Sequence, residues 1–128
     1  MLKTKSYKLI PWKVIAAGCC LLIAVGSLLP QGTVADLDVQ VSGSGFVEHA
    51  LVYGLLGFSV ARGFTRLSAA VVLSLMCLLG VFFEWIQMVF LQRTFNPYDV
   101  LANILGILAG LALARLWSLL FVRPEKET

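Results

Sequence analysis

The chain has 128 residues, of which 59% are hydrophobic and 13% are charged, and its net charge is +3. Soluble domains are about 45–50% apolar and about 25% charged. A water-soluble chain of this length has too little interior to bury so many apolar side chains. The composition therefore excludes a disordered, fibrous or nucleic-acid-binding chain and argues against an ordinary soluble enzyme. It predicts an integral membrane protein of the all-α class.

The three cysteines, Cys19, Cys20 and Cys77, all lie inside apolar runs. Neither a Cys-x-x-Cys pair nor a Cys/His spacing typical of a metal site occurs around them. We therefore expect them to act as small hydrophobic residues. The sequence predicts no metal site and no cofactor.

Four apolar stretches are long enough, or nearly so, to cross about 30 Å of hydrocarbon. We expect one domain over residues 1–128, a bundle of four transmembrane helices with spans at about 11–29, 46–61, 67–90 and 98–122. The second span is the shortest and would need a locally thinner bilayer or extra residues before it. Asn96 followed by Pro97 is typical of a helix cap and a first helical turn.

The start of the chain allows an alternative. Basic residues precede the first apolar stretch, and Thr33-Val34-Ala35 could imitate a cleavage site, as in a secretory signal peptide. The apolar stretch is long for a signal and ends at Pro30. We therefore expect the first stretch to be a span.

The basic residues predict the orientation. In a four-span topology, nine of the ten lie on one side: Lys3, Lys5, Lys8, Lys13, Arg62, Arg66, Arg115, Arg123 and Lys126. Only Arg93 lies on the other side. Because cytoplasmic loops are enriched in Lys and Arg, we expect both termini in the cytoplasm.

Polar side chains gather at one depth on this topology. The outer half of the bilayer would hold Glu48, His49, Tyr53, Glu84, Gln87, Arg93, Asp99 and Asn103. Ionisable groups inside spans are costly and usually functional. Glu84 would lie roughly 9 Å below the outer surface at the helical rise of about 1.5 Å per residue. Arg93 and His49 are its candidate partners, and protonation of Glu84 would also remove the charge.

Two interpretations of this polar layer remain open. It could be a pocket that binds a ligand, or a hydrogen-bonded clasp that only orients the helices. Small residues predict where the helices touch. Gly57 continues the face of His49 and Tyr53, while Gly106 and Gly110 form a GxxxG stripe. Three tryptophans, Trp12, Trp85 and Trp117, are expected at the membrane interface or against lipid.

Two segments carry a resemblance to a known family. The first holds Glu48-His49, Tyr53 and Gly57, and the second holds Glu84-x-x-Gln87, Arg93, Asp99-x-x-x-Asn103 and Gly106. This pattern, over about residues 46–110, resembles the VanZ-like family of small bacterial membrane proteins. The Asp-Lys pair that often precedes the family's His is missing here, where Gly43-Ser-Gly-Phe46 stands instead.

The resemblance implies a multi-pass protein of the bacterial cytoplasmic (inner) membrane, with a role in the cell envelope. The family's namesake is associated with resistance to the glycopeptide teicoplanin. The leading hypothesis is a non-enzymatic protein whose polar pocket binds a lipid head group or a lipid-linked cell-wall intermediate. No nucleic-acid partner is expected, and oligomerisation remains open.

Two alternatives remain. A small membrane enzyme could modify an envelope lipid, with Glu84 and His49 as a general acid/base pair and Asp99 orienting the His. No Ser or Cys nucleophile lies beside the polar layer, which favours binding over catalysis. A proton-coupled lipid flippase or transporter is the third possibility, since buried Glu and His can relay protons.

Overall fold

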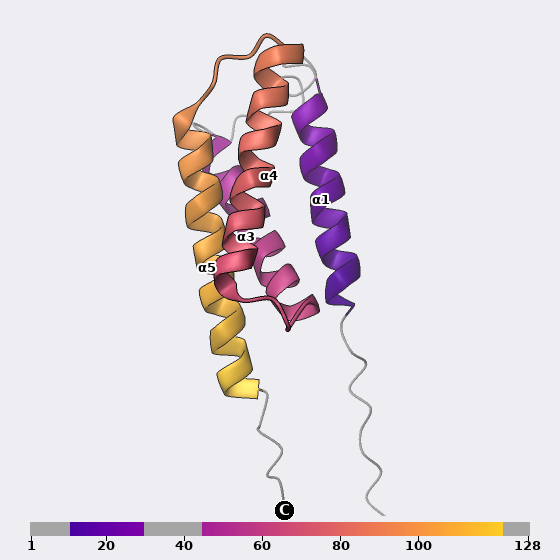
Figure 1. Cartoon of the computed structure of the whole chain (residues 1–128), viewed down its shortest axis with the longest axis vertical. Helices are drawn as coiled ribbons and strands as arrows, with labels where there is room; N and C mark the ends of the chain where they lie inside the picture. Colours follow the sequence, from indigo (N-terminus) through magenta and orange to yellow (C-terminus); the bar gives the residue numbers. More distant parts are fainter. Residues whose placement is uncertain (1–10, 30–44, 122–128) are drawn as a thin grey trace, which may run out of the picture.

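The structure, a computed structural model, describes residues 11–29 and 45–121. The regular structure of these residues consists of four helices and no strand: α1 (Trp12–Leu28), α3 (Gly45–Gly63), α4 (Ala69–Phe90) and α5 (Pro97–Phe121) (Figure 1). The predicted all-α class is confirmed. Each helix begins and ends close to one of the apolar stretches recognised in the sequence.

Two of the helices begin with capping groups that their sequences indicate. The Ser68 hydroxyl accepts a hydrogen bond from the backbone N–H of Val71 at 3.3 Å, at the start of α4. The Asn96 side-chain oxygen accepts from the backbone N–H of Tyr98 at 3.1 Å, and Pro97 occupies the first position of α5. These bonds satisfy amides that have no partner inside the helix.

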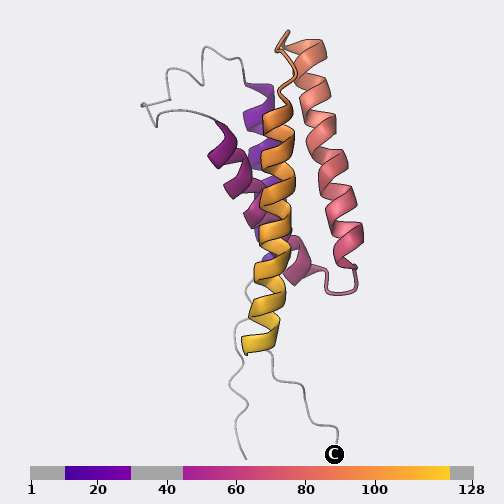
Figure 2. The same cartoon turned by 90° about the vertical axis from the view of Figure 1, so that its left-hand side faces the viewer.

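The central contact of the fold joins α3 and α5, which run in the same direction while α1 and α4 run in the opposite one (Figures 1 and 2). A Cβ atom on Gly106 would collide with the carbonyl oxygen of Ala50, and one on Gly110 with the carbonyl oxygen of Gly54. Glycine therefore lets the two backbones touch. Both pairs are offset by 56 positions, the separation that also relates Arg62 to Ser118, so the register holds along the parallel pair.

The remaining helices cover this pair unequally. α1 packs on α3 through Ala16, Cys19 and Ile23, which are buried. Figure 2 shows α4 standing to one side of the other three helices. Its buried residues are Val72, Gly80, Glu84 and Gln87. Partly buried hydrophobic residues of α4, among them Met76 and Phe83, also pack against the core, and the most buried positions of α4 include two polar side chains.

Most of the apolar surface of the described helices is exposed. α4 and α5 are long and apolar enough to cross a membrane, and only 17% and 22% of their most apolar stretches are buried. The core helix of a soluble protein would be mostly buried. α1 is apolar but shorter, and α3 carries Glu48, His49 and Arg62. The fold therefore supplies two span-capable helices among the described residues, and the four-span topology stays a prediction.

Candidate functional site

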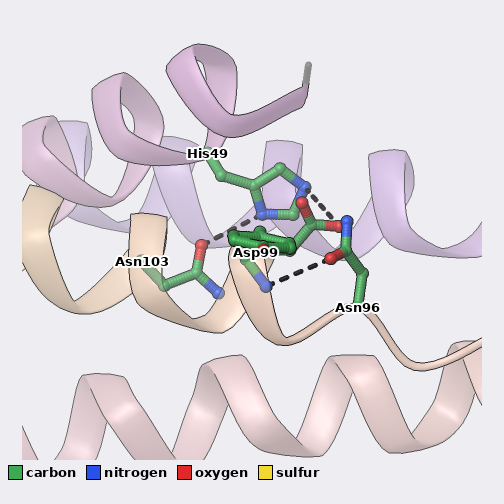
Figure 3. A network of polar contacts seen from close by, with 5 residues as sticks. His49, Asn96, Asp99 and Asn103 are labelled. Atoms are coloured by element: carbon green, nitrogen blue, oxygen red, sulfur yellow. Dashed lines mark hydrogen bonds and ion pairs between the residues drawn. The ribbon is translucent and has the colours of Figure 1, made fainter.

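His49 lies in the first turns of α3 and meets two residues of α5 (Figure 3). Its Nδ1 is 3.0 Å from the Asn103 side-chain oxygen, so the Nδ1–H donates to that amide. Its Nε2 is 3.9 Å from Oδ2 of Asp99. Asp99 and Asn103 are one helical turn apart and share a face of α5. The imidazole is therefore hydrogen-bonded at Nδ1, while its Nε2 faces the Asp99 carboxylate beyond hydrogen-bond distance.

Glu84 brings a second carboxyl group to this end of the bundle, from α4. Its side chain is only 5% exposed. Its carboxylate interacts electrostatically with Asp99, His49 and Arg93, and with the backbone N–H of Asn96. Burying a carboxylate is unfavourable unless hydrogen bonds or opposite charges compensate. The Asn96 amide and the positive charge of Arg93 favour the carboxylate form and Asp99 disfavours it, but among the described residues Glu84 forms no ion pair within 4.0 Å.

Gly80 is the point at which α4 approaches the buried polar groups of the other two helices. A Cβ atom at this position would lie 2.9 Å from the Asn103 side-chain nitrogen and 3.5 Å from the Tyr53 hydroxyl. Tyr53 and Asn103 are each 3% exposed. The missing side chain of Gly80 therefore leaves room for an amide and a phenol between three helices.

The connection between α4 and α5 places Arg93 and Asn96 beside Glu84. The backbone carbonyl of Gln87 accepts hydrogen bonds from the N–H groups of Leu91, at 3.1 Å, and Arg93, at 3.2 Å. The backbone of Gln92 adopts a left-handed conformation with φ of 52°, which residues other than glycine adopt infrequently. This turn ends α4 and brings the half-buried Arg93 back toward the helix it has just left.

The structure thus brings together six of the residues proposed from sequence: His49, Tyr53, Glu84, Arg93, Asp99 and Asn103. We call these six residues the polar cluster. Gln87 is buried one turn beyond Glu84 on α4. Glu48 was also expected here, but the structure leaves its side chain exposed in the first turn of α3. Neighbouring helical residues project about 100° apart, so Glu48 and His49 do not share a face.

Two contributors to the site were not singled out from sequence. Asn96 had been interpreted only as a helix cap, and its backbone N–H also interacts with Glu84. Gly80 precedes Glu84 by four residues, the spacing that puts two residues on one helix face. That spacing was a usable signal, because Gly80, Glu84 and Gln87 form the buried stripe of α4.

The chemistry available at this end combines acids, a base and hydrogen-bond donors. Glu84, Asp99 and His49 can exchange protons, while Arg93, Tyr53 and Asn103 can bind an anionic or hydroxyl-rich group. Within residues 11–29 and 45–121, no set of three or more His, Cys, Asp or Glu residues is arranged to hold a metal ion.

The sequence model of a family described as VanZ/LLP1 matches residues 2–118. No curated protein matches the chain, and no solved structure matches it.

Proposed function

Because the chain belongs to the VanZ/LLP1 family, we propose that it is a multi-pass protein of the bacterial cytoplasmic membrane whose polar cluster binds an envelope lipid. In this proposal the cluster opens toward the outer leaflet. Its ligand is a lipid head group or a lipid-linked cell-wall intermediate, and binding contributes to glycopeptide resistance. The observation that carries the proposal is the burial of Glu84 beside Asp99, His49 and Arg93.

A simple clasp between helices needs fewer charges than this. Polar pairs between membrane helices stabilise by about 0.6 kcal/mol on average, which one bond such as that of His49 to Asn103 supplies. Burying two further acids and an arginine at the same depth is unfavourable for stability, and binding of a ligand would account for their presence. A ligand with a polar head and an acyl or prenyl tail suits polar groups placed beside exposed apolar helix faces.

Arg93 has the chemistry to select such a ligand. A guanidinium binds phosphate or carboxylate with two parallel hydrogen bonds. Tyr53 and Asn103 would orient hydroxyl or amide groups of the head group. We therefore propose a ligand that carries a phosphate or carboxylate near its membrane interface.

Antibiotic susceptibility provides the first test. A sensitive bacterial host would express the wild type, Glu84→Gln or Arg93→Ala at matched membrane levels and be exposed to teicoplanin and vancomycin. We expect protection by the wild type and its loss in both variants, because Glu84→Gln removes a titratable carboxyl group and Arg93→Ala removes a positive charge from the polar cluster.

Glu48→Gln is the matched control, since it removes an exposed carboxylate from the same end of the bundle. It should protect as well as the wild type. Equal protection by Glu84→Gln and the wild type would contradict a role for the polar cluster. A lack of protection by the wild type, at verified expression, would contradict the link to glycopeptides, and lipids retained by the purified protein would then test binding directly.

Catalysis is a second candidate, favoured by the way His49 is held between Asn103 and Asp99. A general base needs such orientation. In this alternative His49 and Glu84 would transfer protons to and from an envelope lipid. Turnover of a lipid-linked substrate by the purified protein, lost in both His49→Gln and Glu84→Gln, would distinguish an enzyme from a binding protein.

A further inference from the structure

A second polar contact between α3 and α5 lies at the end of the pair opposite the polar cluster. Arg62 donates from Nη1 to the Ser118 hydroxyl at 2.9 Å, and this hydroxyl donates to the carbonyl of Ala114 at 3.0 Å. The Nε of Arg62 is buried and has no hydrogen-bond partner within the described part of the chain. Ser118 therefore binds Nη1, the protein covers Nε, and Nη2 is left without a hydrogen-bond partner among the described residues.

The charge of Arg62 is also uncompensated among these residues. The carboxylates of residues 11–29 and 45–121 are Glu48, Glu84 and Asp99, and all three lie at the other end of the bundle. The one ion pair of this part of the chain joins His49 to Asp99. A half-buried cation with an unpaired N–H is unfavourable without an acceptor. The planar N–H groups of a guanidinium are suited to phosphate oxygens.

The surroundings of Arg62 match the level of lipid head groups. The ammonium of Lys13 lies 5.1 Å from the centre of the Phe64 ring, and α1 touches α3 here because a Cβ on Gly63 would be 3.1 Å from the Lys13 backbone nitrogen. The Phe58 ring contacts Trp12 and Trp117 edge-on, with centroids 5.1 Å and 6.2 Å away. Tryptophans and basic residues are typical of the cytoplasmic membrane interface.

We propose that Arg62 binds the phosphodiester of an anionic phospholipid from the cytoplasmic leaflet. The Nη2–H group donates to a phosphate oxygen, Ser118 holds the plane of the guanidinium through Nη1, and Lys13 adds a second positive charge at the same end of the bundle. Basic pockets between helices on the cytoplasmic side bind such head groups. This site is separate from the polar cluster and does not depend on the function proposed for it.

The test compares charge-conserving variants of two arginines from the same end of the bundle. The full-length protein would be purified into phosphatidylcholine nanodiscs, and its relative affinity for phosphatidylglycerol measured by native mass spectrometry. Arg62→Lys keeps the charge but lacks the planar guanidinium that Ser118 holds in place, so we expect the affinity to fall by about tenfold or more. The matched control is Arg66→Lys, at an exposed position, and it should leave the affinity unchanged.

Further measurements keep the result interpretable. The melting temperature in phosphatidylcholine alone reports whether each variant is folded. If Arg62→Lys is not folded, Ser118→Ala takes its place and should lower the affinity by a smaller factor, because the guanidinium loses its support. Glu48→Gln, at an exposed position of the opposite end and outside the polar cluster, should bind phosphatidylglycerol like the wild type.

Two outcomes would overturn the proposal. Equal affinities of Arg62→Lys and the wild type would mean that only diffuse charge attracts the lipid. Competition by inorganic phosphate as strong as that by phosphatidylglycerol would assign the site to free phosphate rather than to a lipid.

Discussion

Asn103 joins α5 to both α3 and α4 through one side chain. Its side-chain oxygen accepts from His49, and its nitrogen faces Gly80 of α4. Asn103 thus contacts two neighbouring helices through a single amide. A buried amide of this kind stabilises one arrangement of the helices, because any other arrangement leaves it unpaired.

This contact can be measured by a double-mutant cycle of His49→Ala and Asn103→Ala. We expect Asn103→Ala to lower the free energy of unfolding by about 1–2 kcal/mol, since His49 loses its acceptor. The double variant should cost less than the two single variants together, with a coupling of about 0.6 kcal/mol. Reversible unfolding in bicelles provides the measurement, and strictly additive effects would contradict the bond.

Gly80→Ala tests the fit between α4 and the buried amide. The new methyl group would lie 2.9 Å from the Asn103 nitrogen, so Asn103 or α4 must move. We expect a loss of about 1–3 kcal/mol in the free energy of unfolding. Gly26→Ala is the control, because no atom lies within 4 Å of the added methyl group and helix propensity favours alanine by about 0.5–1 kcal/mol. Equal effects of the two changes would refute the close approach.

The residue scale also shows what sequence reasoning could and could not reach. The helical spacing of His49, Tyr53 and Gly57 already indicates one inward face of α3, and Glu48 does not belong to it. Only the position of Glu48 next to His49 in the sequence suggests it as a residue of the site. Gly80, by contrast, lacks chemistry of its own, and its role depends on which helix lies opposite. That neighbour is a property of tertiary packing and cannot be obtained from one sequence.

At the scale of elements, the α3–α5 pair is the most tightly packed part of the structure. Backbone touches backbone where Gly106 meets Ala50 and Gly110 meets Gly54. The sequence predicts that Gly106 and Gly110 form a packing stripe and that Gly57 lies on the packing face of α3. A Cβ on Gly57 would be 3.2 Å from the carbonyl oxygen of Ile107, so all three glycines lie in this contact.

Gly110→Ala should therefore be more harmful than a single methyl group suggests. The added atom would collide with the backbone of Gly54 and lie 2.8 Å from the backbone nitrogen of Phe58, and backbone atoms cannot rotate away. We expect a loss of roughly 3 kcal/mol or a failure to accumulate, at the upper end for overpacked interiors. Membrane yield and thermal unfolding would be compared with Gly18→Ala, whose added atom meets nothing within 4 Å. A wild-type yield and melting temperature would contradict the glycine contact.

Helix limits were accessible from sequence for a simple reason. Prolines, caps and apolar length are local signals, and they mark the ends of α1, α4 and α5 close to where the structure has them. The pairing of α3 with α5 is not local. Nothing in one sequence distinguishes it from a bundle in which consecutive helices are the closest neighbours, because the glycine stripes only say that some helix comes near.

At the scale of the whole molecule, the arrangement divides into two unlike ends. One end holds the polar cluster, and the other holds Arg62, Lys13 and the start of α4. The distribution of basic residues predicts that the second end faces the cytoplasm. The described helices are compatible with this, since α1 and α4 run opposite to α3 and α5.

The topology can be tested with reporters that are active on only one side of a membrane. We expect a reporter inserted after Gly43 to read as external, and reporters at the two termini to read as cytoplasmic. The physical reason is the excess of Lys and Arg at one end. A cytoplasmic signal at Gly43 would mean that the orientation is reversed or that the chain crosses the membrane fewer times. In either case the polar cluster would not lie at the outer leaflet.

The parallel pairing of α3 and α5 has a consequence for how the chain is made. Synthesis proceeds from the N-terminus, so α3 emerges before its main partner exists. The whole of α4 must be produced and turned back before α5 can reach the glycine face of α3. During that interval Ala50 and Gly54 present a bare strip of backbone, with only α1 beside the helix. A polypeptide interrupted after Phe90 would keep that strip uncovered, because α5 is the helix that packs against it.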